Sequence, residues 1–148
     1  MTKEEFQKIF DIASKHYPQE ILNHAISVSE YVEQDPRFFL LPEDEQWLVK
    51  SIAIAHDLLE DTSCSMEELT NEISSDKDKA QFIKSLDSLT RREYESYPIY
   101  IDRIVSVATL FALMVKQSDM KDHLARKETL TPSLKKRYKQ VIPLLIGR

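Results

Sequence analysis

Glycine is almost absent from this chain of 148 residues, which contains a single one, Gly147. Phosphate-binding loops of the Walker A type and the dinucleotide-binding fingerprint both need glycines whose backbone approaches the phosphates. The sequence therefore excludes both kinds of nucleotide cradle. Tight β-hairpin turns also consume glycine, so strand-rich folds are disfavoured. We expect an all-α fold, a compact single-domain bundle of six or seven helices.

Cysteine and long apolar runs are scarce as well. The lone Cys64 cannot form a disulfide within the chain, which favours a reducing compartment. No apolar stretch approaches the roughly 20 residues that cross a bilayer, and no basic-then-apolar leader opens the chain. A chain of 148 residues is also the size of one domain. We expect one domain over residues 1–148, cytoplasmic and without a membrane partner.

Positive charge is in short supply, because the formal net charge is −5. This balance disfavours broad nucleic-acid binding, and we expect no nucleic-acid partner. Residues 116–148 nevertheless hold 9 basic and 3 acidic side chains, whereas residues 1–115 hold 11 basic and 22 acidic ones. The basic run 135–139 is typical of a solvated helix face. The same tail could instead serve a homodimer contact or a ligand.

Apolar residues recur at helical spacing along most of the chain. Capping boxes at Thr2 and Ser65 and prolines at helix starts mark where several helices begin. Residues 87–97 are polar and predict a loop. The expected helices are 2–16, 18–32, 42–59, 66–73, 78–86, 97–127 and one from Pro132 that Pro143 ends or kinks.

Three carboxylates and a histidine crowd the end of the predicted helix 42–59, whose middle is apolar nearly all round, in Ala55-His56-Asp57-Leu58-Leu59-Glu60-Asp61-Thr62. On a continuous helix, His56 and Glu60 share one face. Asp57 and Asp61 share the next. Clustered carboxylates beside a buried helix cost several kcal/mol per ion unless a cation or hydrogen-bond donors compensate. A divalent metal ion is one such compensating cation.

Two further candidates for metal ligation lie far away in the sequence. His24 sits in the apolar stripe of the helix expected at 18–32, where the plainer interpretation is a core imidazole bonded to a carbonyl. Asp119 continues an apolar helix, which is costly unless the carboxylate is paired. Lys116, three residues earlier, could provide that pairing by itself.

These residues resemble the ligand pattern of the HD superfamily of metal-dependent phosphohydrolases. The segment His56–Thr62 looks like the HDxxEDT signature of the (p)ppGpp hydrolase domains of RelA/SpoT-type proteins and their small single-domain relatives. The segment 89–103 is similar to part of small bacterial HD proteins, and 115–122 resembles their VKxADLxD run. Together the matching blocks span roughly residues 20–125.

The resemblance implies one divalent metal ion as cofactor. Its ligands would be His24, His56, Asp57 and Asp119. Manganese is the expected ion, with iron, zinc and magnesium as alternatives, since imidazole and carboxylate ligands suit several divalent metals. Glu60 and Asp61 would lie beside the ion and act in catalysis, positioning or deprotonating the attacking water.

A phosphate substrate also needs cationic or aromatic side chains around it, because negative charge develops during transfer. The substrate-binding candidates are Lys116, Arg91, Arg92, Arg103, Tyr97, Tyr100 and His123. For the arginines the plainer alternative is a surface ion pair with nearby acids such as Glu93, Glu95 and Asp102. For the tyrosines it is core or rim packing.

The expected function is hydrolysis of a phosphoester or pyrophosphate group of a nucleotide, of which (p)ppGpp 3'-pyrophosphohydrolase activity is one form. The chain departs from the RelA/SpoT-type pattern at two places that bear on the substrate. Residues 14–20 lack its basic stretch and Gly-Pro-Tyr turn, and His123 stands where those enzymes have an asparagine. The alternative function is a catalytically idle HD domain that binds a nucleotide or a protein partner as a regulatory module.

Overall fold

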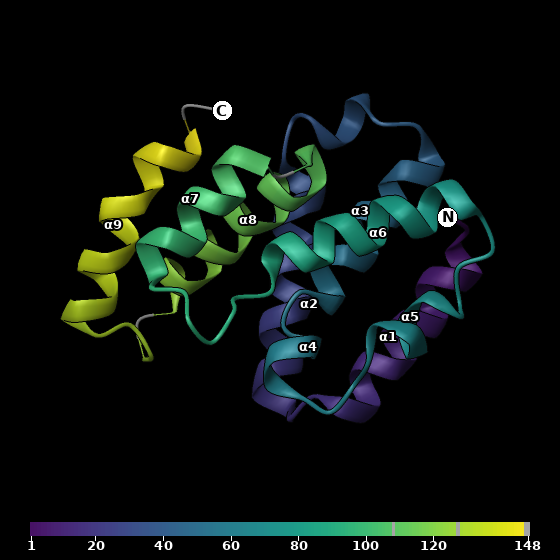
Figure 1. The fold of residues 1–148 in the computed structure, drawn as a ribbon, viewed down its shortest axis with the longest axis horizontal. Coiled ribbons are helices and arrows are strands. Elements are labelled where there is room, and N and C mark those ends of the chain that lie inside the picture. Colours follow the sequence, from purple (N-terminus) through teal and green to yellow (C-terminus); the bar gives the residue numbers. More distant parts are fainter. Residues whose placement is uncertain (108, 127, 147–148) are drawn as a thin grey trace.

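The computed structural model describes residues 1–107, 109–126 and 128–146, and within them it is all-helical, as the scarcity of glycine predicts (Figure 1). Nine α-helices and one short 3-10 helix, η1, make up the regular structure of these residues. In chain order they are α1 (Lys3–His16), α2 (Gln19–Gln34), η1 (Phe38–Leu40), α3 (Glu43–Ala55), α4 (Leu58–Asp61), α5 (Met66–Thr70), α6 (Asp76–Leu89), α7 (Tyr97–Val107), α8 (Leu110–Ala125) and α9 (Pro132–Ile146).

Local capping explains where several helices begin. At α1 the Thr2 hydroxyl accepts a hydrogen bond from the Glu5 N–H at 3.1 Å, and the Glu5 carboxylate accepts one from the Thr2 N–H at 2.9 Å. The Ser65 hydroxyl accepts the Glu68 N–H at 3.2 Å and starts α5. These bonds satisfy backbone donors that have no partner within a helix. The predicted starts at Thr2 and Ser65 are confirmed.

The predicted helix 42–59 is wrong at its end, because α3 stops at Ala55 and α4 begins at Leu58. The buried Tyr17 hydroxyl causes this break. It accepts a hydrogen bond from the Asp57 N–H at 3.2 Å and donates one to the Ile54 carbonyl at 2.8 Å. An amide bonded to a side chain outside the helix cannot continue the backbone ladder, so the chain turns here.

One further helix prediction is wrong. The predicted helix 97–127 is divided, since α7 ends at Val107 and the Thr109 hydroxyl accepts the Ala112 N–H at 3.1 Å to start α8. Of the two outcomes expected at Pro143, an end of the helix is wrong, because α9 continues through it to Ile146, and a kink stays a prediction. The breaks between α3 and α4 and between α7 and α8 explain why the expected six or seven helices are too few, since the described residues form nine α-helices.

Helix α3 lies at the centre and packs against α1, α2, α6 and α8. Its residues 51–55 are buried on all sides, as the sequence predicts for a helix that is apolar all round. The buried apolar side chains of the described residues form one core. At one edge of the molecule, α9 packs beside α7 and α8 (Figure 1). Within the described ranges, we find no helix with the length and apolar character needed to span a membrane.

Candidate metal centre and its cavities

The four side chains expected to bind a metal meet between α2, the α3–α4 turn and α8, and we call this group the metal centre. Its members are His24, His56, Asp57 and Asp119. Nε2 of His24 lies 2.8 Å from a carboxylate oxygen of Asp119 and 3.9 Å from one of Asp57. Nε2 of His56 lies 3.1 Å from the Asp57 carboxylate and 3.3 Å from that of Asp119. The fold thus joins residues up to 95 positions apart.

Both imidazole rings are held by their other nitrogen. Nδ1 of His56 donates to the Ala53 carbonyl at 2.6 Å, and Nδ1 of His24 donates to the Asp122 carboxylate at 2.5 Å. Each Nδ1 faces an acceptor and so carries a hydrogen. Both Nε2 atoms consequently face the carboxylates of the centre. An imidazole oriented in this way by a carbonyl or a carboxylate is the usual arrangement of a metal-ligating histidine.

Nε2 of His56 has no hydrogen-bond partner within the part of the chain that the structure describes, although it is buried. Buried polar atoms rarely stay unpaired. Nitrogen and oxygen ligands bind divalent first-row ions at about 2.0–2.2 Å, so neighbouring ligands of one ion lie about 3 Å apart. The contacts of 2.8, 3.1 and 3.3 Å among the nitrogens and carboxylates agree with that spacing. The donor set therefore fits a divalent metal ion.

The charges of the centre shift the pKa values of its histidines and of Asp119 so that the charged form of each is favoured. Burial disfavours the charged imidazoles, but other contacts outweigh it. The bonds to Asp119 and Asp122 raise the pKa of His24, and the negative charges of Asp57 and Asp119 raise that of His56. Burial likewise opposes ionisation of Asp119, yet Lys116 and the imidazoles lower its pKa well below its ordinary value. The centre is a site where carboxylates stay negative and require cations around them.

Asp119 is the most heavily contacted member of the centre. One of its oxygens binds Nζ of Lys116 at 2.9 Å, and the other lies 3.1 Å from Nε2 of His123. Lys116 is buried, and its ammonium lies 5.6 Å from the ring centroid of Tyr97 and 5.1 Å from that of Tyr100. Asp119 therefore pairs with Lys116, as the plainer interpretation expects, and also lies against the histidines of the metal centre.

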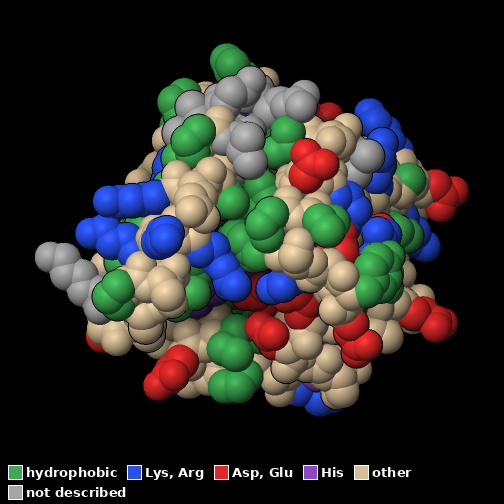
Figure 2. Space-filling view, turned by 60° about the vertical axis from the view of Figure 1, so that its left-hand side comes forward, with side chains coloured by type: hydrophobic (Ala, Val, Ile, Leu, Met, Phe, Trp, Pro, Cys, Tyr) green, Lys and Arg blue, Asp and Glu red, His purple; other side chains and the backbone are tan. Residues whose placement is uncertain are grey.

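Two cavities adjoin the metal centre. The larger cavity, of about 550 Å³, is lined by Glu20, Ile21, Asn23, His24, Asp57, Asp61, His123, Arg126, Glu128, Thr129, Leu134 and Tyr138. The smaller cavity, of about 160 Å³, is lined by His56, Asp57, Glu60, Arg91, Tyr97, Tyr100, Lys116, Asp119, His123, Arg137 and Tyr138. Figure 2 shows Lys and Arg side chains beside a hollow in which acidic side chains are visible.

The two acids expected to act in catalysis lie on α4, one at each cavity. Glu60 lines the smaller cavity, and its carboxylate accepts the backbone N–H of Arg91. Asp61 lines the larger one. Burial and the negative charge of Asp57 raise the pKa of both carboxyls above their ordinary values. Each is therefore a stronger base than an ordinary surface carboxylate.

The substrate-binding candidates divide into two groups. Lys116, Arg91, Tyr97, Tyr100 and His123 all line the smaller cavity. The hydroxyl of Tyr97 is buried and has no hydrogen-bond partner among the residues described.

Arg92 and Arg103 line neither cavity, and the expectation that they bind substrate stays a prediction. The guanidinium of Arg92 lies 3.7 Å from the carboxylate of Asp87. Arg103 binds Glu95 through Nε at 2.7 Å and donates to the Thr90 carbonyl at 3.0 Å. For these two arginines the structure supports the plainer alternative of ion pairing.

Sequence reasoning missed several residues of the site. Asp122, which accepts a hydrogen bond from His24, could have been identified from its spacing, because it follows Asp119 by three residues and so lies on the same face of α8. Tyr138 stacks on His123 with 5.4 Å between ring centroids, and Arg137 lies 4.5 Å from the Tyr97 ring. Both belong to the basic run 135–139, whose composition favours a solvated face. Tyr17, which breaks α3, had no local signal.

Comparisons with known proteins do not place the chain in a family. No family model matches it, and no curated protein matches it significantly. The resemblance to HD phosphohydrolases therefore depends on the motif residues themselves.

Proposed function

We propose that the protein is an HD-type metal-dependent phosphohydrolase that removes a phosphate or pyrophosphate group from a nucleotide. One observation carries the proposal. Two imidazoles, each fixed through Nδ1, turn Nε2 toward two carboxylates, and the buried Nε2 of His56 has no hydrogen-bond partner among the described residues. A divalent ion satisfies these donors together, and the adjoining cavity supplies cations for a phosphate.

The cofactor we propose is one divalent ion, manganese first, with iron, zinc and magnesium as alternatives. His24, His56, Asp57 and Asp119 would hold it. When bound, such an ion lowers the pKa of a water molecule and polarises a phosphoryl oxygen. The protein's own acids complete the chemistry, since Glu60 and Asp61 have raised pKa values and stand beside the centre. Glu60 is our choice for the base that takes the proton of the attacking water.

The substrate's phosphate belongs in the smaller cavity. Lys116, Arg91 and Arg137 bring three cationic groups to its lining. Water attacks phosphorus, the bond to the leaving oxygen breaks, and these cations balance the negative charge that develops. His123 lines both cavities and can donate a proton to the leaving oxygen.

The nucleoside belongs in the larger cavity, whose volume of about 550 Å³ is in the range of small-molecule sites. Guanosine tetraphosphate is one candidate substrate among nucleotides. In this chain the segment that carries the basic grip of RelA/SpoT-type hydrolases instead places His16 against Glu68 at 3.0 Å. A nucleotide with fewer phosphates, such as a nucleoside monophosphate, is therefore an equal candidate for the substrate.

The proposal predicts phosphate release that depends on a metal ion. Purified protein loaded with manganese is incubated with guanosine tetraphosphate, nucleoside mono- and triphosphates and a generic phosphodiester, and released phosphate and pyrophosphate are measured. We expect one nucleotide class to be cleaved. Asp57→Asn should lose bound metal and activity together, whereas Glu60→Gln should keep the metal and lose at least 100-fold in kcat, the scale of a general base.

Asp102→Asn is the matched control, because Asp102 is exposed on α7 and lines neither cavity. It should behave as the wild type does. Cleavage that continues after complete removal of the metal would refute the proposal. Bound metal with no phosphate released from any member of the panel would favour the idle regulatory domain instead.

A further inference from the structure

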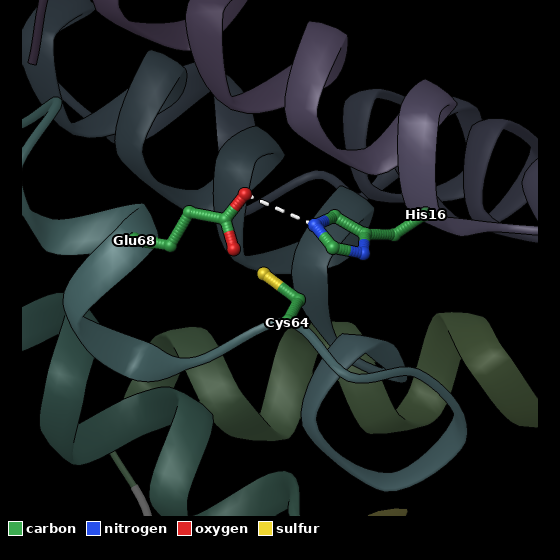
Figure 3. A group of neighbouring side chains, drawn as sticks. All are labelled: His16, Cys64 and Glu68. Atoms are coloured by element: carbon green, nitrogen blue, oxygen red, sulfur yellow. Dashed lines mark hydrogen bonds and ion pairs between the residues drawn. The ribbon is translucent and has the colours of Figure 1, made fainter.

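A second cluster of metal-ligating side chains lies apart from the metal centre, and we call it the sulfur site. It consists of His16 in the last turn of α1, Cys64 in the loop before α5, and Glu68 on α5 (Figure 3). One ligand atom of each lies within 4.8 Å of the others. Figure 3 shows the imidazole, the thiol and the carboxylate directed toward one another. His16 and Glu68 approach to 3.0 Å although they are 52 residues apart.

We propose that the sulfur site binds a second divalent ion of the zinc type, independently of the metal centre. One imidazole, one thiolate and one carboxylate are each common zinc ligands, and zinc sites with three protein ligands keep a fourth position for water. The thiolate separates the two sites chemically. Soft sulfur selects zinc over manganese or magnesium, whereas the metal centre offers nitrogen and oxygen ligands alone.

The backbone around the sulfur site is fixed by hydrogen bonds that involve none of the three proposed ligand atoms. The Thr62 hydroxyl accepts the Cys64 N–H at 3.1 Å and donates to the Leu58 carbonyl at 2.6 Å. The Ser65 hydroxyl accepts the N–H of Glu68 at 3.2 Å. The loop therefore presents Cys64 and Glu68 on the same side with little freedom. Such preorganisation reduces the entropy that metal binding would otherwise lose.

Cys64 is 5% exposed, so its sulfur is shielded from reagents in solvent and lies beside the His16 imidazole and the Glu68 carboxylate. Binding of a metal ion forms a sulfur–metal bond and releases the thiol proton to water.

The position of the sulfur site assigns the ion a structural role. Cys64 stands three residues after Asp61, at the end of α4, and His16 precedes Tyr17, which bonds the Asp57 N–H. An ion bound by His16, Cys64 and Glu68 would fasten the end of α1 to the segment that carries the catalytic acids. The first effect of losing it should be on stability, not on chemistry.

The test uses cobalt as a spectroscopic substitute for zinc in the full-length chain. Thiolate ligation of Co²⁺ gives an intense charge-transfer absorption in the near ultraviolet, and Cys64 is the single cysteine, so the band has one possible origin. We expect the band at one equivalent in the wild type and also in Asp57→Asn, whose metal centre is disabled. Cys64→Ser should abolish it, and Glu68→Gln should weaken Co²⁺ affinity at this site at least tenfold.

Glu72→Gln is the matched control for Glu68→Gln, because Glu72 follows α5 and pairs with Lys8 at 3.8 Å outside the cluster. It should keep the band at full affinity. Absence of the band from the wild type and from Asp57→Asn under Co²⁺ excess would overturn the proposal, and so would a band that persists in Cys64→Ser. Because the readout is absorption and not phosphate release, it stands or falls separately from the proposed hydrolase activity.

Discussion

Glu95 shows how a residue singled out only as a possible ion-pair partner holds a loop in place. It is 4% exposed and accepts hydrogen bonds from Nε of Arg103 at 2.7 Å and from the Arg92 N–H at 2.9 Å. The Arg103 bond is the main reason that the pKa of Glu95 falls to about 2. Arg103 also donates to the carbonyls of Ser88 and Thr90, so one buried carboxylate organises the chain from α6 to α7.

Replacement of Glu95 should destabilise the protein in a pH-dependent way. Because folding lowers the pKa of Glu95 from about 4.5 to about 2, its stabilising effect is complete above pH 4.5 and is lost as pH falls toward 2. Glu95→Gln should lower the free energy of unfolding at pH 7 by about 2 kcal/mol, typical of a buried bond to a charged group. Urea unfolding between about pH 2.5 and 7 measures this.

The difference between Glu95→Gln and the wild type should shrink steadily below about pH 4.5. Glu93→Gln, an exposed neighbour, should change stability by less than about 0.5 kcal/mol at every pH. A deficit in Glu95→Gln that is the same at low and neutral pH would contradict the assigned role.

At the scale of the helices, the break between α3 and α4 places the metal centre. A continuous helix was the reasonable expectation, since the apolar pattern runs through Leu58 and Leu59 without interruption. The break comes from Tyr17, about 40 residues away in the sequence, whose hydroxyl bonds Ile54 and Asp57. Local spacing predicts the bounds of a helix well where a nearby cap sets them, as Thr2 does at the start of α1, and poorly where a distant side chain sets them.

Tyr17→Phe should weaken both the fold and the metal centre. The variant keeps the ring but leaves the Asp57 N–H and the Ile54 carbonyl without their partner, which should cost about 1–2 kcal/mol of unfolding free energy. The freed turn should then hold Asp57 less firmly and lower metal affinity several-fold. Urea unfolding measures the first effect and calorimetric metal titration the second.

Tyr94→Phe is the control for this change, because Tyr94 is 81% exposed and its hydroxyl is not needed in the core. It should match the wild type in both measurements. If Tyr17→Phe unfolds at the wild-type urea concentration and binds metal equally well, the hydroxyl does not maintain the break.

At the scale of the whole molecule, α9 completes the walls of both cavities. The basic run 135–139 predicts a solvated face, and Lys135, Lys136 and Lys139 are indeed exposed. Tyr138, in the same run, is buried against His123. Composition alone could not distinguish the exposed residues of this run from the buried Tyr138, because which side of an amphipathic helix faces a cavity depends on how the helix packs.

The pairing of His24 with Asp119 was expected from the family resemblance, not from local pattern.

Arg137 and Lys136 offer a test of the smaller cavity that holds total charge constant. Arg137 lines the cavity and Lys136 does not. On the proposed function, Arg137→Gln should raise KM for the cleaved nucleotide about tenfold, which corresponds to about 1.4 kcal/mol. Lys136→Gln should leave KM within about twofold. Equal effects of the two changes would indicate that general charge, rather than a contact in the cavity, attracts the substrate.

Helices α2 and α8 cannot slide along each other. Polar contacts join α2 to α8 and to the residue that follows it. Nε2 of His24 lies 2.8 Å from the Asp119 carboxylate, Nδ1 of His24 lies 2.5 Å from that of Asp122, and Arg126, just after α8, donates to the Ser27 hydroxyl at 3.0 Å. A slip by one helical turn, about 5.4 Å, would break all three at once. It would also strand charged groups in the interior, where an unpaired ion is strongly unfavourable. These contacts therefore favour a single register of the two helices.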